Sequence, residues 1–219
     1  MPSQLLHELS RKLLIKKEIV AGKVRALEEA PSTSSTEVIN MNPLSTIADL
    51  DAAQAVAADF RNAMRRLASS VTLVTSLDEY GAPHGMAASA VIPVSMDPPS
   101  MLVAANRSSG LHPVVRSRGS FCVNLLADNH QELLLPFSQS ARRTERFAAG
   151  GWREGYASLL YLPSAPAAMF CELDQEIDYG THTLFVGRVM SVRLYDEECD
   201  PLLWYNGAGT SVSRPRAFA

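Results

Sequence analysis

The chain beyond residue 70 is a series of short β-rich segments separated by turn residues. Strands are predicted at residues 71–75, 86–95, 101–106, 121–126, 167–178, 182–195 and 202–205. The longest segment, 182–195, alternates its side chains with the period of two expected for a strand. Only two short helices are expected between the strands, at about 110–118 and 129–138. Because no strand–helix–strand unit repeats, the pattern favours an antiparallel barrel over a doubly wound parallel sheet.

The N-terminal part of the chain has a helical pattern instead. Residues 4–29 predict one amphipathic helix, in which Lys16 and Lys23 interrupt a strict heptad seam. A second helix is predicted from about residue 47, with Phe60 and Met64 on its apolar face. The first helix has two open interpretations, a tethered and partly frayed arm or a helix that docks on a partner. The expected organisation is a helix at 1–30, a linker at 31–50, a main domain at 51–212 and a tail at 213–219.

Composition excludes several classes of partner. The 219 residues carry 23 acidic and 20 basic side chains, a net charge of −3, which gives no electrostatic reason to bind nucleic acid or an anionic membrane. Cys122, Cys171 and Cys199 are an odd number without a Cys-x-x-Cys pair, which favours a reducing compartment. We find no apolar run of membrane-spanning length, and no signal peptide is expected because Lys16 interrupts the first apolar run. A soluble, cytoplasmic protein is therefore expected.

The common catalytic and nucleotide-binding motifs are missing from the sequence. We find no P-loop, no nucleophile elbow, no His-Glu-x-x-His zinc motif and no complete dinucleotide-binding glycine motif, since Gly207-Ala-Gly209 lacks the third glycine. The five histidines share no metal-ligand spacing. A Rossmann-type nucleotide site and a metal centre are therefore not expected.

Two segments remain as candidates for ligand binding. Residues 85–99 are rich in small side chains, which would let a flat ligand approach backbone N–H groups or would pack tightly inside a barrel. Residues 106–110, Asn-Arg-Ser-Ser-Gly, place hydroxyl groups and one guanidinium before a helix, which suits a phosphate but also an ordinary helix cap. The residues alone leave both alternatives open.

Seven motifs, in order and spacing, resemble the short-chain flavin reductases, the reductase components of two-component flavin monooxygenases such as those acting on phenols and 4-hydroxyphenylacetate. The similar segments run from about residue 58 to 207. They are Phe60-Arg-Asn-Ala-Met64, Val71-Thr-Leu-Val-Thr75, Gly81 with Gly85-Met86, Val94-Ser-Met-Asp-Pro98, Phe121-Cys-Val-Asn-Leu-Leu126, Gly180-Thr-His-Thr-Leu-Phe-Val-Gly187 and Pro201-Leu-Leu-Trp-Tyr205.

The resemblance implies a mostly β (α+β) fold, an FMN-binding split β-barrel with short helices, here with an N-terminal helical extension that has no counterpart in compact family members. It implies a homodimer with FMN or FAD at the subunit interface. It also implies an NAD(P)H-dependent flavin reductase that uses NADH or NADPH as hydride donor and supplies a separate monooxygenase with reduced flavin. Two alternatives stay open: a flavoprotein that keeps its flavin and reduces another acceptor, and a non-catalytic flavin-binding partner protein.

The resemblance also assigns site residues. His182 takes the place of the family's catalytic-site histidine near flavin and nicotinamide, with Gly180 in the same motif. His84 borders the pocket. The flavin-binding segments are Ala87, Ala88, Ser89, Ala90, Val91, Pro93 and Val94 along the ring, and Arg107, Ser108 and Ser109 at the phosphate.

Three departures from the family pattern stand in the site. Thr181 replaces the aspartate before the histidine and so removes a carboxylate beside His182. We expect this change either to lower the pKa of His182 or to free the orientation of its ring. Ala87 and Pro93 replace hydroxyl residues, and Pro93 also removes an N–H group. Ala208-Gly209 replaces a basic-aromatic pair after the last strand, which predicts a more open wall on the nicotinamide side.

Several other side chains carry alternative interpretations. Cys122 and Cys171 are predicted to be inert core thiols and Cys199 to be exposed. Trp152 and Trp204 are expected in the core or at an interface. The basic run of Arg142, Arg143 and Arg146 is either a solvated charge cluster or an attractor of a nucleotide phosphate.

Overall fold

The computed structural model describes residues 47–195 and 199–212. The predicted helix 4–29, the linker up to residue 46 and the predicted tail lie outside the described residues. The chain divides into two compact units, residues 1–52 and 53–219, and the fold and the site described below belong to the second. Helix α2, Ile47–Met64, begins where the sequence predicts it, and its described side chains are exposed.

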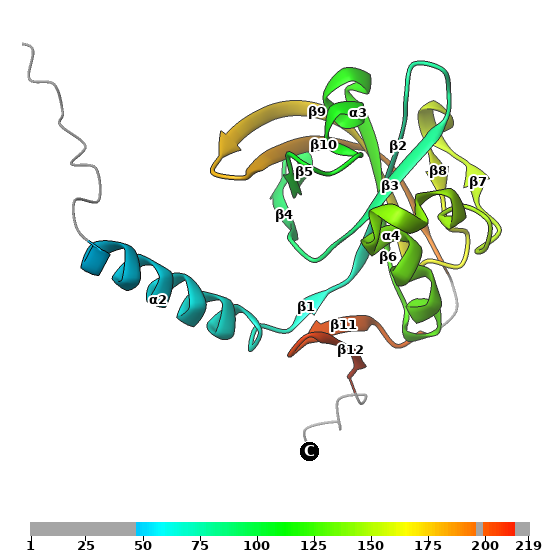
Figure 1. The fold of residues 1–219 in the computed structure, drawn as a ribbon. Helices are drawn as coiled ribbons and strands as arrows, with labels where there is room; N and C mark the ends of the chain where they lie inside the picture. Colours follow the sequence, from blue (N-terminus) through cyan, green and yellow to red (C-terminus); the bar gives the residue numbers. More distant parts are fainter. Residues whose placement is uncertain (1–46, 196–198, 213–219) are drawn as a thin grey trace, which may run out of the picture. The chain divides into compact units, whose positions relative to one another are not determined.

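The second unit is built mainly from strands, with short helices between them (Figure 1). Its strands are β1 Ser69–Ser70, β2 Thr72–Leu77, β3 Pro83–Ala88, β4 Val91–Met96, β5 Pro99–Asn106, β6 Ser120–Leu125, β7 Arg153–Glu154, β8 Leu160–Tyr161, β9 Ala167–Tyr179, β10 His182–Leu194, β11 Leu202–Tyr205 and β12 Ala208–Ser211. The helical segments are α3 His112–Arg118, the 3-10 helix η1 Asp128–Leu133, α4 Leu134–Ser138, η2 Ser140–Glu145 and η3 Tyr156–Ser158.

The principal sheet has seven strands in the order β3-β2-β6-β9-β10-β5-β4, and all neighbours are antiparallel. Its two edge strands, β3 and β4, are joined by Ser89 and Ala90 alone. A flat sheet of this size would hold its edges about 29 Å apart, whereas the short link spans at most about 11 Å. The sheet must therefore curl until its edges meet, which confirms the predicted antiparallel split barrel.

The prediction of a single strand over residues 86–95 is wrong. The chain leaves β3 after Ala88, where it pairs with β2, and enters β4 at Val91, where it pairs with β5 at the other end of the sheet order. The N–H group of Ala104 donates to the carbonyl of Ala90 at 3.0 Å, which fixes the crossing. Composition cannot reveal such a break, because Ser89 and Ala90 are compatible with an extended strand.

The barrel core is formed by apolar side chains from the central strands. Phe121, Phe170 and Phe185 are at most 1% exposed. The predicted alternation of β10 is confirmed in its first half, where Phe185 and Gly187 face the core, and two irregularities then shift its register with β9. Burial of these apolar groups provides the main driving force for folding.

The cysteine predictions are confirmed. Cys122 and Cys171 are fully buried, and Cys199 is exposed. Burial raises the pKa of both core thiols, that of Cys171 to about 12. A thiol in this state is unreactive, because the thiolate is the nucleophile.

A second, three-stranded sheet has the order β1-β11-β12. Asn206 and Gly207 both have positive φ angles, 50° and 84°, and form the tight turn of the β11–β12 hairpin. Ala208 and Gly209 therefore begin a strand that the sequence pattern did not predict. Among the described helices, none is long and apolar enough to cross a membrane.

Candidate functional site

A cleft of about 420 Å³ runs along the end of β3 and its link to β4. Its lining residues are Gly85, Met86, Ala87, Ala88, Ser89, Ala90, Ala104, Asn106, Ser108, Ser109, Gly110, Phe137, Ser138, Ser140, Arg146 and His182. The volume lies in the usual range of small-molecule sites. Because β3 is an edge strand in the described sheet, the N–H groups on its outer side face away from any strand partner. Small side chains and accessible N–H groups are what a flat ligand with hydrogen-bond acceptors requires.

One end of the cleft is a polar loop after β5. Asn106 Oδ1 accepts hydrogen bonds from the Ser108 N–H group at 2.9 Å and from the Ser108 hydroxyl at 2.8 Å. The Ser109 N–H group donates to the Asn106 carbonyl at 2.9 Å, and the Ser109 hydroxyl accepts from the His112 N–H group at 3.2 Å. The asparagine therefore sets the loop conformation through its own side chain. The Ser108 hydroxyl donates its single proton to Asn106, whereas the Ser109 hydroxyl accepts a hydrogen bond and has its proton available to donate to an anion beside this turn.

His182 lies directly beside this loop. It is the first residue of β10 and is paired with Asn106 across the β5–β10 ladder. Its Nδ1 lies 2.9 Å from the hydroxyl oxygen of Thr181. A hydroxyl thus lies beside this ring nitrogen, and the consequence of replacing the family's aspartate by Thr181 stays a prediction. The imidazole is half-buried at the edge of the cleft.

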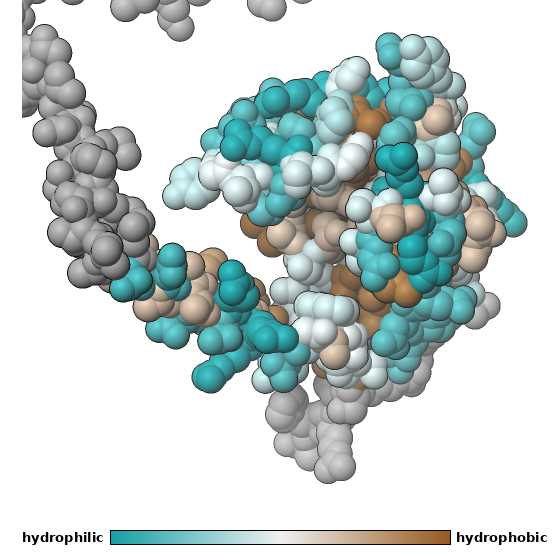
Figure 2. Space-filling view, in the orientation of Figure 1, coloured by the Kyte–Doolittle hydropathy of each residue, from teal (hydrophilic) through white to brown (hydrophobic). Residues whose placement is uncertain are grey.

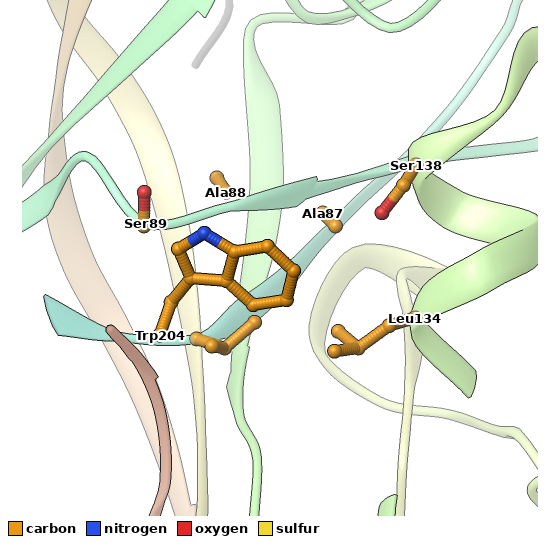
Figure 3. Close-up of a pocket in the computed structure, with 7 residues that line it drawn as sticks. Ala87, Ala88, Ser89, Leu134, Ser138 and Trp204 are labelled. Carbon is orange, nitrogen blue, oxygen red and sulfur yellow. The ribbon is translucent and has the colours of Figure 1, made fainter. Parts of the chain in front are cut away.

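A second, smaller hollow of about 140 Å³ adjoins the cleft and shares Ala87, Ala88, Ser89 and Ser138 with it. Figure 3 shows the indole of Trp204 beside the end of β3, with Leu134 and Ser138 of α4 across the space. Apolar side chains gather in the hollow beside α4 in the space-filling view (Figure 2). Trp204, expected in the core or at an interface, is 41% exposed and offers an aromatic face next to the segment that the family resemblance assigns to the flavin ring.

Seven predicted residues line the cleft together: Ala87, Ala88, Ser89, Ala90, Ser108, Ser109 and His182. The far wall, formed by α4 and η2, was not among the predicted site residues. Phe137, Ser138 and Ser140 carry no motif, and Arg146 belonged only to a basic run with two interpretations. Trp152, in contrast, packs against Phe137 in the core, as expected.

Six predicted residues lie outside the lining of the cleft. Val91 packs against the barrel core, while Pro93 and Val94 are exposed on the edge strand β4. Their contact with a ligand stays a prediction.

The other three residues are engaged elsewhere. Arg107 donates from its guanidinium to the carbonyl of Gly180 in the β9–β10 turn, and His84 Nε2 lies within hydrogen-bonding distance of Asp78 Oδ2, at 3.1 Å. Arg107 and Gly180 therefore support the turn before His182 instead of facing the cleft.

Two further histidines are buried and serve as structural groups. His112 Nε2 lies 2.8 Å from the Thr183 hydroxyl, and His130 Nδ1 accepts the Ala127 N–H group at 3.1 Å while Nε2 lies 2.9 Å from the Ser164 hydroxyl. Burial lowers the pKa of both imidazoles. Within residues 47–195 and 199–212, no three histidine, cysteine or acidic side chains are grouped so as to hold a metal ion.

The curled sheet defines a split-barrel protein with a cleft along its edge strand β3. The chain belongs to the flavin reductase family: residues 64–213 match the flavin reductase like domain. It is 39% identical over 165 residues to the reductase component of an FADH(2)-dependent resorcinol hydroxylase from a Rhizobium species, covering 74% of this chain and 90% of the relative.

Two other relatives support the same assignment. The chain is 35% identical over 156 residues to the FMN reductase (NADH) RutF of Cronobacter sakazakii, covering 71% of this chain and 93% of the relative. The styrene monooxygenase flavin reductase of Pseudomonas putida S12 has a similar solved structure, with a TM-score of 0.65, 26% identity, and coverage of 72% of this chain and 99% of that chain. The family resemblance inferred from the sequence motifs is thus confirmed.

Proposed function

We propose that this protein is an NADH-dependent flavin reductase that binds FMN or FAD in the cleft along β3 and supplies the reduced flavin to a separate monooxygenase. The observation that carries the proposal is the convergence of the 87–90 segment, the 106–109 loop and His182 on one cleft. NADH and FMN are named for the RutF relative, and a hydroxylase partner is named for the Rhizobium relative.

The residues of the cleft fit a flavin. Ala87, Ala88 and Ala90 leave the backbone accessible to a flat ring, whereas larger side chains would fill the space that the ring requires. The polar loop offers the Ser109 hydroxyl as a donor to a phosphate, and the Ser108 hydroxyl could join it by turning away from Asn106. Apolar and polar groups are thus segregated along the cleft as they are along a flavin nucleotide.

The bound flavin would supply the redox chemistry, acceptance of a hydride from the reduced nicotinamide. The chain's own residues would position the reactants, which provides most of the rate enhancement in such a transfer. Backbone N–H groups of the segment at 87–91 are candidates to stabilise negative charge that develops on the ring. His182, oriented by Thr181, would hold the nicotinamide side of the site and act as a hydrogen-bond donor.

A homodimer is part of the proposal. Ile92, Val94 and Met96 on β4 are 54%, 51% and 83% exposed, and Met190 and Val192 on β10 are also exposed. Apolar side chains gathered on strands in this way are typical of surfaces that associate with another chain. A cytoplasmic location is proposed as well, since NADH is an intracellular donor and the cysteines are free thiols.

Steady-state turnover tests the proposal. Purified protein is mixed with NADH or NADPH and with increasing FMN or FAD, and the decay of the nicotinamide absorbance is followed with and without oxygen. NADH oxidation that saturates with added flavin supports the proposal. Absence of NADH oxidation with both flavins, in protein shown by fluorescence quenching to bind flavin, contradicts it. Light scattering of the purified protein tests the dimer.

A further inference from the structure

The basic run along η2 and directly after it contains three arginines with different surroundings. Arg142 forms an ion pair with Glu145, with Nη2 and Oε2 2.5 Å apart. Arg143 is exposed. Arg146 alone of the three lines the cleft. Arg142 and Arg143 therefore fit the interpretation as a solvated charge cluster, whereas only Arg146 is placed to attract a phosphate of a ligand in the cleft.

Arg146 is held in a fixed position by neutral groups. Its Nε donates to the carbonyl of Pro136 at 3.0 Å, and its Nη1 donates to the carbonyl of Gly85 at 2.6 Å. Its guanidinium carbon lies 6.0 Å from the centroid of the Phe137 ring. Gly85 and Phe137 also line the cleft, so the guanidinium is fixed to the wall by atoms that belong to the site.

The positive charge of Arg146 has no anionic partner within the described residues. No ion pair there includes Arg146, and the neighbouring charge that acts on it is a second cation, Arg143. Partial burial, followed by Arg143, lowers its pKa, yet an arginine stays protonated at neutral pH. A half-buried cation without a counter-charge is costly, and an anion in the cleft would offset that cost.

We infer that Arg146, together with the hydroxyl groups of Ser138 and Ser140 on the same wall, is a binding site for a phosphoryl group of the ligand. This inference rests on the proposed function and adds a subsite on the α4–η2 wall, which the family resemblance did not assign. The phosphoryl group belongs either to the flavin 5′-phosphate or to the pyrophosphate of NADH. Both are anions with oxygen acceptors that match the guanidinium.

The test compares ligands with and without phosphate. Arg146→Met removes the guanidinium and its charge but keeps an unbranched stem, and Arg146→Lys keeps the charge. Arg142→Met is the matched control in the same basic run. Affinities for FMN and riboflavin are measured by flavin fluorescence quenching. Affinities for NADH and for its phosphate-free analogue, dihydronicotinamide riboside, are measured by competition. Circular dichroism melting verifies that each variant is folded.

Arg146→Met is expected to weaken one phosphate-bearing ligand by about tenfold or more, the loss of one charge-assisted hydrogen bond. Its phosphate-free counterpart should bind with unchanged affinity. Selective loss of FMN assigns the flavin phosphate, and selective loss of NADH assigns the pyrophosphate. Arg146→Lys should retain most of the affinity, and Arg142→Met should bind as the wild type does.

Equal losses for ligands with and without phosphate, or no loss at all, would overturn the inference and leave Arg146 as a structural anchor for Gly85. If Arg146→Met does not fold, an Arg146→Lys variant that weakens all four ligands equally has the same meaning. If the wild-type protein turns over NADH and flavin, but the Arg146 variants show no selective loss of phosphate-bearing ligands, only this inference is overturned. Wild-type protein that binds neither flavin nor NADH overturns the proposed function itself.

Discussion

His112 Nε2 and the hydroxyl oxygen of Thr183 lie 2.8 Å apart in the protein interior, and the Thr183 hydroxyl donates in turn to Asp178. Since the hydroxyl donates to a carboxylate, it accepts from the imidazole, and His112 carries its proton on Nε2. His112 begins α3 directly after the polar loop of the cleft, and Thr183 follows His182. This hydrogen bond therefore ties the two polar parts of the site to each other.

Replacing Thr183 by valine should destabilise the protein. The side chain is fully buried, so valine would leave the His112 N–H group without its acceptor at a cost of about 1–3 kcal/mol. Thr183→Ser keeps the hydroxyl and should retain the hydrogen bond, although it removes a methyl group. The free energy of unfolding from urea titration is the measurement. A Thr183→Val variant as stable as the wild type would show that this bond contributes nothing net.

Stability should fall as the pH is lowered from about 7.5 to about 5.5. Burial lowers the pKa of His112 and His130 in the folded state, whereas unfolded histidine titrates near 6.5. Below about pH 6.5 the unfolded chain therefore binds more protons than the folded one, and stability is lost as the pH falls. Urea titrations at several pH values should give a shallower slope for the His112→Gln/His130→Gln double variant. An equal slope in both proteins would assign the pH dependence to other groups.

Gly85→Ala should destabilise the barrel and weaken ligand binding. A Cβ atom at this position would overlap the Phe137 ring, which packs tightly among Phe147 and Trp152. Overpacking of this kind costs about 1–3 kcal/mol. Gly110→Ala is the control for stability, because a Cβ there meets nothing within 4 Å. The measurement is the melting temperature of each variant. Equal melting temperatures for Gly85→Ala and Gly110→Ala would show that the Phe137 ring shifts at no cost in stability.

His182→Ala should weaken NADH more than flavin, since the proposed role of this residue lies on the nicotinamide side. Thr181→Val should have a smaller effect in the same direction, because it removes only the hydroxyl that orients Nδ1. The KM for NADH and the Kd for FMN, measured separately for each variant, give the comparison. Equal losses of affinity for NADH and FMN would show that His182 does not act on the nicotinamide side of the site.

The sequence allowed the barrel and part of the site to be predicted because both have local signals. The alternation in β10 is visible in the order of residues, and the small-residue stretch with the 106–110 loop is contiguous in the chain. The break at Ser89 and Ala90 has no such signal, since it follows from the pairing of β3 and β4 with opposite ends of the sheet order.

The α4–η2 wall shows the same limit. Arg146 meets the carbonyl of Gly85, 61 positions earlier in the chain, and no pattern within either segment indicates this contact. The side chains of Arg107 and His84 were assigned to the site from their neighbours along the chain. In the structure, Arg107 donates to the Gly180 carbonyl and His84 contacts Asp78, and neither contact lies in the cleft. Short motifs thus locate a site, whereas the direction of each side chain depends on tertiary contacts.

The most direct test of the proposed reaction is flavin reduction without oxygen. FMN and NADH are mixed under nitrogen with a catalytic amount of the purified protein, and the loss of the oxidised flavin absorbance is followed. The proposed function predicts rapid loss of that absorbance in proportion to the protein added, with one NADH consumed per flavin. A rate equal to that of the protein-free mixture, in a sample that binds FMN, would contradict it.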